Sequence, residues 1–490
     1  MQVYVNYGRV EDLARLAELG LSLSGRIALS RYGKIFRGNR LSNCQTAGAI
    51  GVIMFSDPAD VAPLGTGPDQ VYPNTFFLPE SGMQRGSVKI GSGDPLSPSW
   101  PSVAGAYRLE YNKVKGRPLI PSQPIGYGDA QQLLAVMGGQ AAPADWQGGL
   151  NLTYRLGGDW AAGREGWRVR LTTHNSLQDT EDSSVLGLIR GVEEPDRYVL
   201  VSNHRDAWGY GAVDPSSGTA ALMEAARVLG GLAASGEWRP RRSILFASFS
   251  TEEYGLMGSY EWVFDKIHKL MDRAVAIINI DICVKGPILD PEASPVLKAV
   301  MLEAIKAVPG PSGEGSYHEW LSEYLARENT TVENKIKILG SGSDHAPFAF
   351  YAGVPALKFD FEIDRQKYPG VSSYPAYHTG YETFYLVSSL LDPGFSTHRT
   401  CAQLQTQLAV SLAAPRLLPH SPSHLVTALE RALQDLNTSG KVRSTHISQK
   451  ESTQLFFSKG GTTGGPGGGR GLQTDGGGAG QVQAGSGAVD

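Results

Sequence analysis

The chain has 490 residues, of which 41% are hydrophobic and 19% charged, and 44 Lys and Arg nearly balance 48 Asp and Glu. This length predicts several domains with a large buried core, and the net charge of −4 argues against a nucleic-acid partner. The sequence contains no apolar run long enough for a membrane helix, and no signal-peptide pattern opens it.

Residues 1–175 combine short apolar runs with many glycine- and proline-rich turns. The runs 25–33 and 48–57 have the composition of buried strands. The segment 58–125 contains mainly turn sequences. We therefore expect a β-rich module with long loops, and we find no catalytic constellation within it.

From about residue 176, apolar strands alternate with amphipathic helices. Near-continuous apolar strands separated by helices indicate an α/β fold whose mostly parallel sheet is covered by helices. The predicted strands are 197–204, 242–250, 274–281 and 355–361, and the predicted helices are 216–236 and 253–270.

The last part of the chain is simpler. Between Leu417 and Lys450, one helical stretch, 424–436, lies between polar segments. Residues 460–490 are rich in glycine and lack apolar periodicity, so they cannot bury enough surface to offset their ordering entropy and are predicted to be disordered.

Three cysteines, Cys44, Cys283 and Cys401, are far apart and match neither a zinc motif nor a disulfide framework. We therefore expect them to be free or buried. Sites that would permit glycosylation, which weakly favour an extracellular setting, occur at Asn151, Asn329 and Asn437.

Side chains that can bind metals follow three successive predicted strands. His204 ends the first strand, Glu252 and Glu253 follow the second, Asp281 ends the third, and Asp214 lies at the start of the intervening helix. Because the carboxyl ends of parallel strands meet at one edge of the sheet, these groups are expected to share a site. Taken singly, each could be a helix cap or a solvated charge.

The residue types favour zinc, which binds imidazole and carboxylate ligands. With His378, which follows the fourth strand, the set exceeds what one zinc ion needs. A carboxylate shared between two ions about 3.5–4 Å apart would account for the surplus. One residue of the Glu252–Glu253 pair would bind metal, and its neighbour would take a proton from a metal-activated water.

At these positions the sequence resembles the glutamate carboxypeptidase II family of M28-type zinc peptidases, which also includes transferrin receptor. The resemblance covers roughly 1–400 and implies a protease-associated (apical) domain at 1–175 and a zinc peptidase domain at 176–400. Residues 401–459 would be a remnant or replacement of the family's helical dimerisation domain. The matching segments are 31–40, 55–63, 125–130, 203–220, 237–262, 278–281 and 373–387.

The resemblance implies a role for each candidate residue in peptide hydrolysis by a water activated between two zinc ions. Glu252 would be the general base. The implied metal ligands are His204 and Asp281 for the first zinc, Glu253 and His378 for the second, and Asp214 for both. Tyr377 would bind the substrate and the oxyanion, and Arg37 would bind the substrate carboxylate; a packing tyrosine and a surface arginine are the alternatives.

Several positions depart from the family pattern. Phe77 replaces an asparagine of the glutamate-preferring carboxypeptidase, and its basic patch falls here on Lys358, a candidate substrate contact, and Asp360. An aspartate there would repel an acidic substrate. For a possible Ca²⁺ site, Ser97 and Glu261 have counterparts, but Phe264 stands where a second glutamate is expected.

These features predict an exopeptidase for small peptides, either aminopeptidase-like or a dipeptidase or carboxypeptidase. The alternatives are a non-catalytic receptor-type member, which would lack zinc ligands, and an inactive truncated form. Family members are homodimers on the extracellular face of the plasma membrane, whereas this chain is expected to lack the membrane helix and most of the dimerisation domain.

Overall fold

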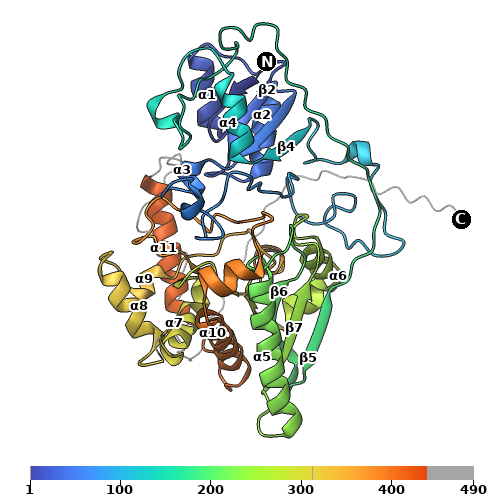
Figure 1. Cartoon of the computed structure of the whole chain (residues 1–490). Helices are drawn as coiled ribbons and strands as arrows, with labels where there is room; N and C mark the ends of the chain where they lie inside the picture. Colours follow the sequence, from blue (N-terminus) through green and yellow to red (C-terminus); the bar gives the residue numbers. More distant parts are fainter. Residues whose placement is uncertain (1, 312, 439–490) are drawn as a thin grey trace, which may run out of the picture. The chain divides into compact units, whose positions relative to one another are not determined.

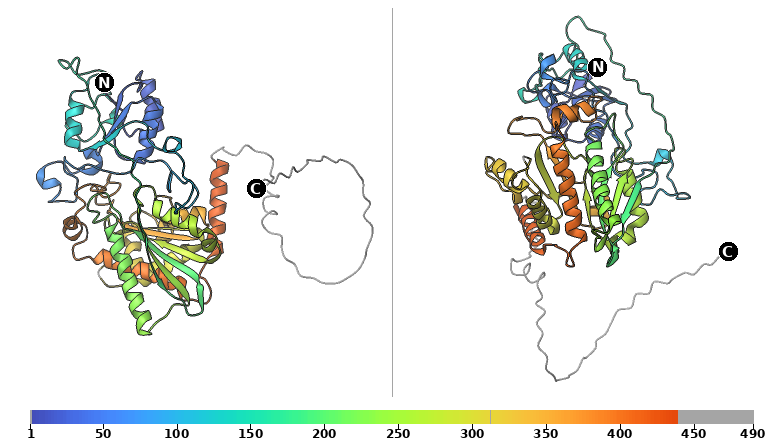
Figure 2. Two further views of the ribbon diagram at one scale, coloured as in Figure 1. Left: turned by 90° about the vertical axis from the view of Figure 1, so that its right-hand side faces the viewer. Right: turned by 60° about the horizontal axis from the view of Figure 1, so that its bottom comes forward.

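The computed structural model describes residues 2–311 and 313–438, so the predicted disorder of 460–490 lies outside the described residues. The described residues up to Leu429 form one compact unit, which contains two β-sheets (Figures 1 and 2).

The first sheet is small and entirely parallel. Its strands lie in chain order: β1 (Gln2–Tyr4), β2 (Ile27–Arg31), β3 (Gly51–Phe55) and β4 (Ser122–Ile125). Three helices belong to this module: α1 (Val10–Glu18), α2 (Arg37–Thr46) and α4 (Tyr127–Ala135). A short helix, α3 (Pro58–Val61), follows β3, and the segment between it and β4 consists of turns, bends and irregular backbone with two short 3-10 helices, Pro68–Gln70 and Tyr111–Lys113. The module is thus less β-rich than expected, because helices follow β1, β2 and β4.

The second sheet is the α/β sheet that the sequence predicts. Its order is β5-β7-β6-β8-β10-β9, in which the four central strands are parallel and the two edge strands antiparallel. Each predicted strand is present. The strands are β5 (Val185–Ile189), β6 (Glu194–His204), β7 (Arg242–Phe249), β8 (Ala274–Asn279), β9 (Ile288–Ala293) and β10 (Ala356–Glu362).

Helices cover both faces of this sheet, and side chains alternate between them. Val199 and Val201 of β6 belong to the apolar cluster under α5 (Ser216–Ser235), α7 (Lys298–Ala307) and α10 (Ser396–Ala413), whereas Leu200 belongs to the cluster under α6 (Met257–Arg273). The remaining helices are α8 (Tyr317–Ala326), α9 (Val332–Lys335) and α11 (Pro422–Thr438). Among the described helices, none has the length and apolar character of a membrane span.

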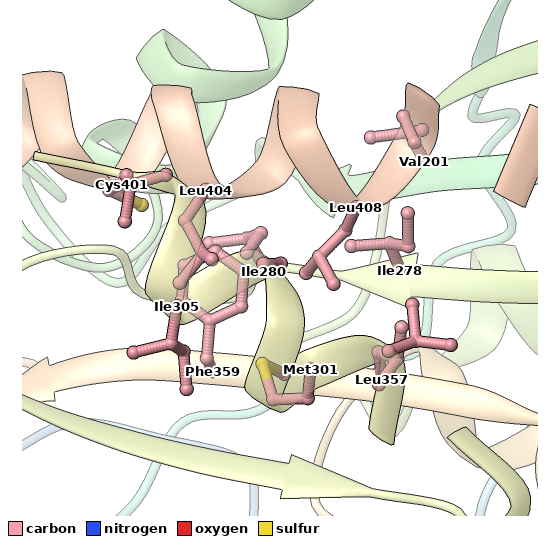
Figure 3. Packing of buried hydrophobic residues seen from close by; sticks show 14 of the residues in the cluster. Val201, Ile278, Ile280, Met301, Ile305, Leu357, Phe359, Cys401, Leu404 and Leu408 are labelled. Atoms are coloured by element: carbon pink, nitrogen blue, oxygen red, sulfur yellow. The ribbon is translucent and has the colours of Figure 1, made fainter. Parts of the chain in front are cut away.

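Helix α10 packs over the centre of the apolar cluster that it shares with α5 and α7. Its Leu404 and Leu408 are fully buried and point toward Ile278 and Ile280 at the end of β8 (Figure 3). Asp281, a candidate metal ligand, follows β8. Helix α10 therefore also supports the edge of the sheet where the candidate ligands lie.

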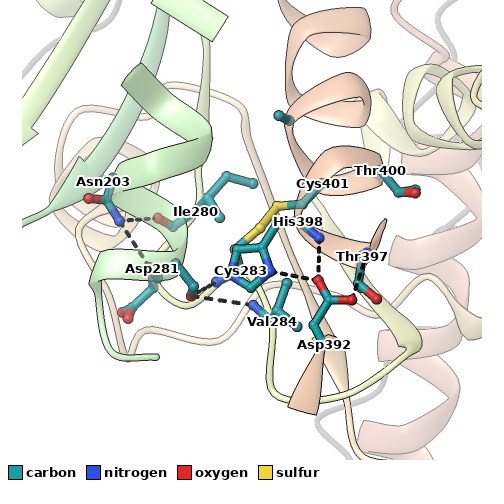
Figure 4. Close-up of a disulfide and its surroundings, with 12 residues drawn as sticks. Asn203, Ile280, Asp281, Cys283, Val284, Asp392, Thr397, His398, Thr400 and Cys401 are labelled. Atoms are coloured by element: carbon teal, nitrogen blue, oxygen red, sulfur yellow. Dashed lines mark hydrogen bonds and ion pairs between the residues drawn. A yellow bond between two sulfur atoms is a disulfide. The ribbon is translucent and has the colours of Figure 1, made fainter. Parts of the chain in front are cut away.

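All three cysteines are buried, as expected, but the expectation that none forms a disulfide is wrong. Cys283 and Cys401 form a disulfide between the loop after β8 and α10 (Figure 4), while Cys44 is buried and free. The two half-cystines are 118 residues apart, and their spacing in the sequence carries no information about pairing.

Replacing Leu404 by Ala should lower the free energy of unfolding by about 2–5 kcal/mol, because the change leaves a cavity beneath α10. Urea denaturation followed by circular dichroism measures the loss. Met223→Ala on α5, whose side chain is 66% exposed, is the control and should change stability by less than about 0.5 kcal/mol. Equal effects of the two substitutions would contradict the packing described for α10.

Candidate metal centre

The candidate ligands lie at the carboxyl edge of the second sheet. His204 is the last residue of β6, Glu253 lies on the turn after β7, and Asp281 follows β8. Asp214 precedes α5, and His378 lies in the loop beyond β10. Asn203 ties two of these ends together, because its side chain donates to the carbonyls of Ile280 (2.7 Å) and Asp281 (2.9 Å) (Figure 4).

The structure brings these five residues together as two groups that share Asp214. In the first group, His204 Nε2 is 3.3 Å from Asp214 Oδ1 and 3.1 Å from Asp281 Oδ1. In the second, His378 Nε2 is 3.2 Å from Asp214 Oδ2 and 3.1 Å from Glu253 Oε1. The Asp214 carboxylate therefore presents one oxygen to each histidine.

Burial and charge show that this donor set suits a cation. His204 and His378 are each 1% exposed, and the buried Asp214 Oδ1 and Glu253 Oε1 have an imidazole nitrogen beside them but no lysine or arginine among the described residues. Burial by itself would lower the pKa of His204, but the Asp281 and Glu252 carboxylates raise it well above its usual value. Two imidazoles and three carboxylates match the ligand preference of zinc.

Glu252 lies outside both groups. It lines a cavity of about 400 Å³ beside them, and burial raises its pKa well above that of an ordinary glutamate. Asp206 fixes the turn that carries both glutamates, because its carboxylate accepts the backbone N–H groups of Glu252 and Glu253 at 3.1 Å each. The Asp206 carbonyl also lies 3.0 Å from His204 Nδ1.

Sequence reasoning missed Asp206, although its position two residues after His204 was an available signal. It also missed Glu382, whose carboxylate accepts the backbone N–H groups of Asp214 and His378. The available signal there was a glutamate four residues after a candidate histidine ligand.

The other wall of the cavity comes from the first module. Arg37, at the start of α2, and Lys89 line it together with Tyr377, whose ring stacks on His378 with centroids 3.7 Å apart. Arg37 Nη2 lies 2.9 Å from His378 Nδ1, and burial lowers the pKa of Lys89 to about 8. The first module thus contributes to the site, although the sequence shows no catalytic constellation in it.

Lys358 lies elsewhere. It is on β10, outside the residues that line this cavity, with its ammonium 3.6 Å from Glu292 and 3.8 Å from Asp360. The structure places it in an ion-pair network instead of beside the two histidines.

A third acidic group, Asp290, Asp360 and Glu362, belongs to that network and already has cationic partners. The ammonium of Lys285 lies 3.0 Å from Asp360 and 2.6 Å from Glu362. Lys335 and Lys337 pair with Asp290. These lysines neutralise the carboxylates, which distinguishes this group from the two at the sheet edge.

At the possible calcium site, the Glu261 side chain binds backbone N–H groups. Its carboxylate accepts the backbone N–H groups of Asp94 (2.7 Å) and Ser102 (2.6 Å) and so ties a loop of the first module to α6. Phe264 packs against Tyr260 and Tyr351. Within the described residues, no three acidic or imidazole groups converge at Ser97.

Comparison with known proteins finds matches for both modules of the chain. Residues 184–389 match the model of Peptidase family M28, and residues 2–90 match that of the PA domain. The chain is 41% identical over 443 residues to "Aminopeptidase NAALADL1" of Mus musculus, covering 88% of this chain and 59% of that protein. It is 40% identical over 442 residues to "Glutamate carboxypeptidase 2 homolog" of Caenorhabditis briggsae, covering 87% and 56%.

The chain thus spans less than two thirds of the length of these curated relatives. Among solved structures, BSAP, a zinc aminopeptidase from Bacillus subtilis, is 17% identical with a TM-score of 0.44, over 85% of this chain and 76% of that one. Residues 184–389 therefore form a domain of peptidase family M28, and residues 2–90 form a PA domain, as the curated relatives also indicate.

Proposed function

We propose that this chain is a dinuclear zinc exopeptidase that removes a terminal residue from small peptides. The observation that carries the proposal is the placement of Asp214, whose two carboxylate oxygens face His204 and His378 separately. His204 and Asp281 would hold one ion, Glu253 and His378 the other, and Asp214 both. Zinc ions bound there would polarise the scissile carbonyl and lower the pKa of a water.

Glu252 would act as the general base. It belongs to neither ligand group, it lines the cavity, and Asp206 fixes its backbone. Its raised pKa brings the carboxylate closer to the range in which a group both accepts and returns a proton near neutral pH. Glu252 would take the proton of the attacking water and deliver it to the leaving amine.

Arg37 would bind a substrate carboxylate. When His378 binds metal through Nε2, its Nδ1 carries the proton and donates to the carbonyl of Arg85, 3.1 Å away. The Arg37 guanidinium has only donors, so it would then direct its N–H groups into the cavity instead of toward Nδ1. Tyr377, on the same wall, would donate a hydrogen bond to the developing oxyanion.

The cavity favours a short peptide whose carboxyl end lies toward the first module. Arg37 and Lys89 both line that side and can attract a carboxylate. Lys358 is engaged by Glu292 and Asp360, so it supplies little free positive charge for an acidic side chain. This arrangement favours an aminopeptidase-like dipeptidase over a carboxypeptidase that selects acidic residues.

We further propose that the chain matures in an oxidising compartment. The Cys283–Cys401 disulfide is buried and links two segments that support the ligand Asp281. Structural disulfides of this kind form in secreted and extracellular proteins, which agrees with the extracellular location that the family resemblance implies.

Glu252→Gln should reduce turnover of a short peptide by at least about 100-fold, because the amide cannot accept the proton, while two zinc ions remain bound. Glu253→Gln is the matched comparison and should lose zinc as well as activity. Peptidase assays and zinc analysis by mass spectrometry on the same samples give both readouts. Full activity of the Glu252 variant would rule out its role as the base.

Digestion of a peptide library with mass-spectrometric readout should show release of amino-terminal residues from short peptides, and a zinc chelator should abolish it. Peptides with an acetylated amino terminus should resist cleavage, whereas carboxy-amidated ones should be cleaved with a raised KM, because Arg37 and Lys89 lose their partner. Cleavage that persists in the chelator would contradict the metal mechanism, and preferential release of carboxy-terminal residues would reverse the assignment of the terminus.

A further inference from the structure

We propose that Glu382 is the positioning residue that holds the bridging Asp214 and the ligand His378 at the separation that a metal pair needs. This inference rests on the proposed function. Glu382 belongs to neither candidate ligand group.

Glu382 makes three hydrogen bonds from a fully buried position. One carboxylate oxygen accepts the backbone N–H of Asp214 and the hydroxyl of Tyr374, the latter at 2.9 Å. The other oxygen accepts the backbone N–H of His378 at 3.1 Å. One carboxylate group therefore fixes the main chain of two ligands that are 164 residues apart.

The backbone at His378 explains why such a tether is needed. His378 has a φ of 58°, in the left-handed region that residues other than glycine rarely adopt. Residues held in such conformations persist only when their surroundings determine them. The hydrogen bond from the His378 N–H to Glu382 supplies part of that constraint and directs the imidazole toward Asp214.

Fold stability alone is a weak explanation for a carboxylate at this position. Burying a carboxylate is costly unless it is compensated, and in the described part of the chain Glu382 forms no ion pair with a lysine or arginine. Its three hydrogen bonds end at Asp214, His378 and Tyr374, and the Tyr374 ring packs against Tyr377. Every hydrogen bond of the Glu382 side chain thus ends at the candidate metal centre or its immediate support.

The test is Glu382→Gln, measured by zinc content per chain during a stepwise titration with a chelator. Whichever way the amide is turned, its NH₂ group faces the backbone N–H of Asp214 or of His378, and one tether is lost. Loss of a residue that orients metal ligands weakens binding by about 10–100-fold. We expect one zinc ion to be released at a correspondingly lower chelator concentration, while the ion held by His204 and Asp281 changes less.

Asp392→Asn is the matched control. Asp392 is also a buried carboxylate that accepts backbone N–H groups, those of Thr397 and His398 at the start of α10, but it touches no ligand (Figure 4). Its substitution should leave both zinc affinities unchanged even if the melting temperature falls. Wild-type zinc affinity in the Glu382 variant, or weakening confined to the ion held by His204 and Asp281, would overturn the inference.

If the Glu382 variant does not fold, Tyr374→Phe replaces it. This change removes the hydrogen bond that orients the Glu382 carboxylate, so one zinc ion should be held several-fold less tightly, and unchanged affinity would overturn the inference. A wild-type chain that binds no zinc would refute the proposed function itself. A wild-type chain that binds two zinc ions, together with a Glu382 variant of unchanged affinity, would refute only the role of Glu382.

Discussion

The shared carboxylate of Asp214 is the constraint on which the rest of the site depends. It must meet a histidine from the end of a central strand on one side and a histidine from a distant loop on the other. Parallel strands satisfy the first demand, because their carboxyl ends deliver His204 and Asp281 to one edge. The second demand requires local support, and Asp206 and Glu382 provide it by accepting backbone N–H groups.

Two kinds of acidic group in this chain differ in their cationic partners. Asp290, Asp360 and Glu362 are as close together as the candidate ligands at the sheet edge, yet Lys285, Lys335 and Lys337 neutralise them. At the sheet edge, the ion-pair partners of Asp214 and Glu253 among the described residues are the imidazoles of His204 and His378, not lysines. The presence or absence of a lysine partner separates a structural ion-pair network from a group of carboxylates suited to a metal.

Much of the α/β fold could be predicted, because apolar strands and amphipathic helices leave a periodic pattern. His204, Glu253 and Asp281 could be predicted from their positions at strand ends, whereas Asp214 and His378 lie at a helix start and in a loop. The Cys283–Cys401 bond, the tether at Glu382 and the approach of Arg37 to His378 could not, since each joins segments whose proximity depends on the folded loops. The helices of the first module were not predicted, because the many glycine- and proline-rich turns of residues 1–175 indicated strands and long loops instead.

Anomalous X-ray diffraction at the zinc edge, from crystals of the zinc-loaded chain, tests the central claim most directly. The account predicts two peaks about 3.5–4 Å apart, one bounded by His204 and Asp281, the other by Glu253 and His378, with Asp214 between them. A single peak, or two peaks that do not share Asp214, would contradict it.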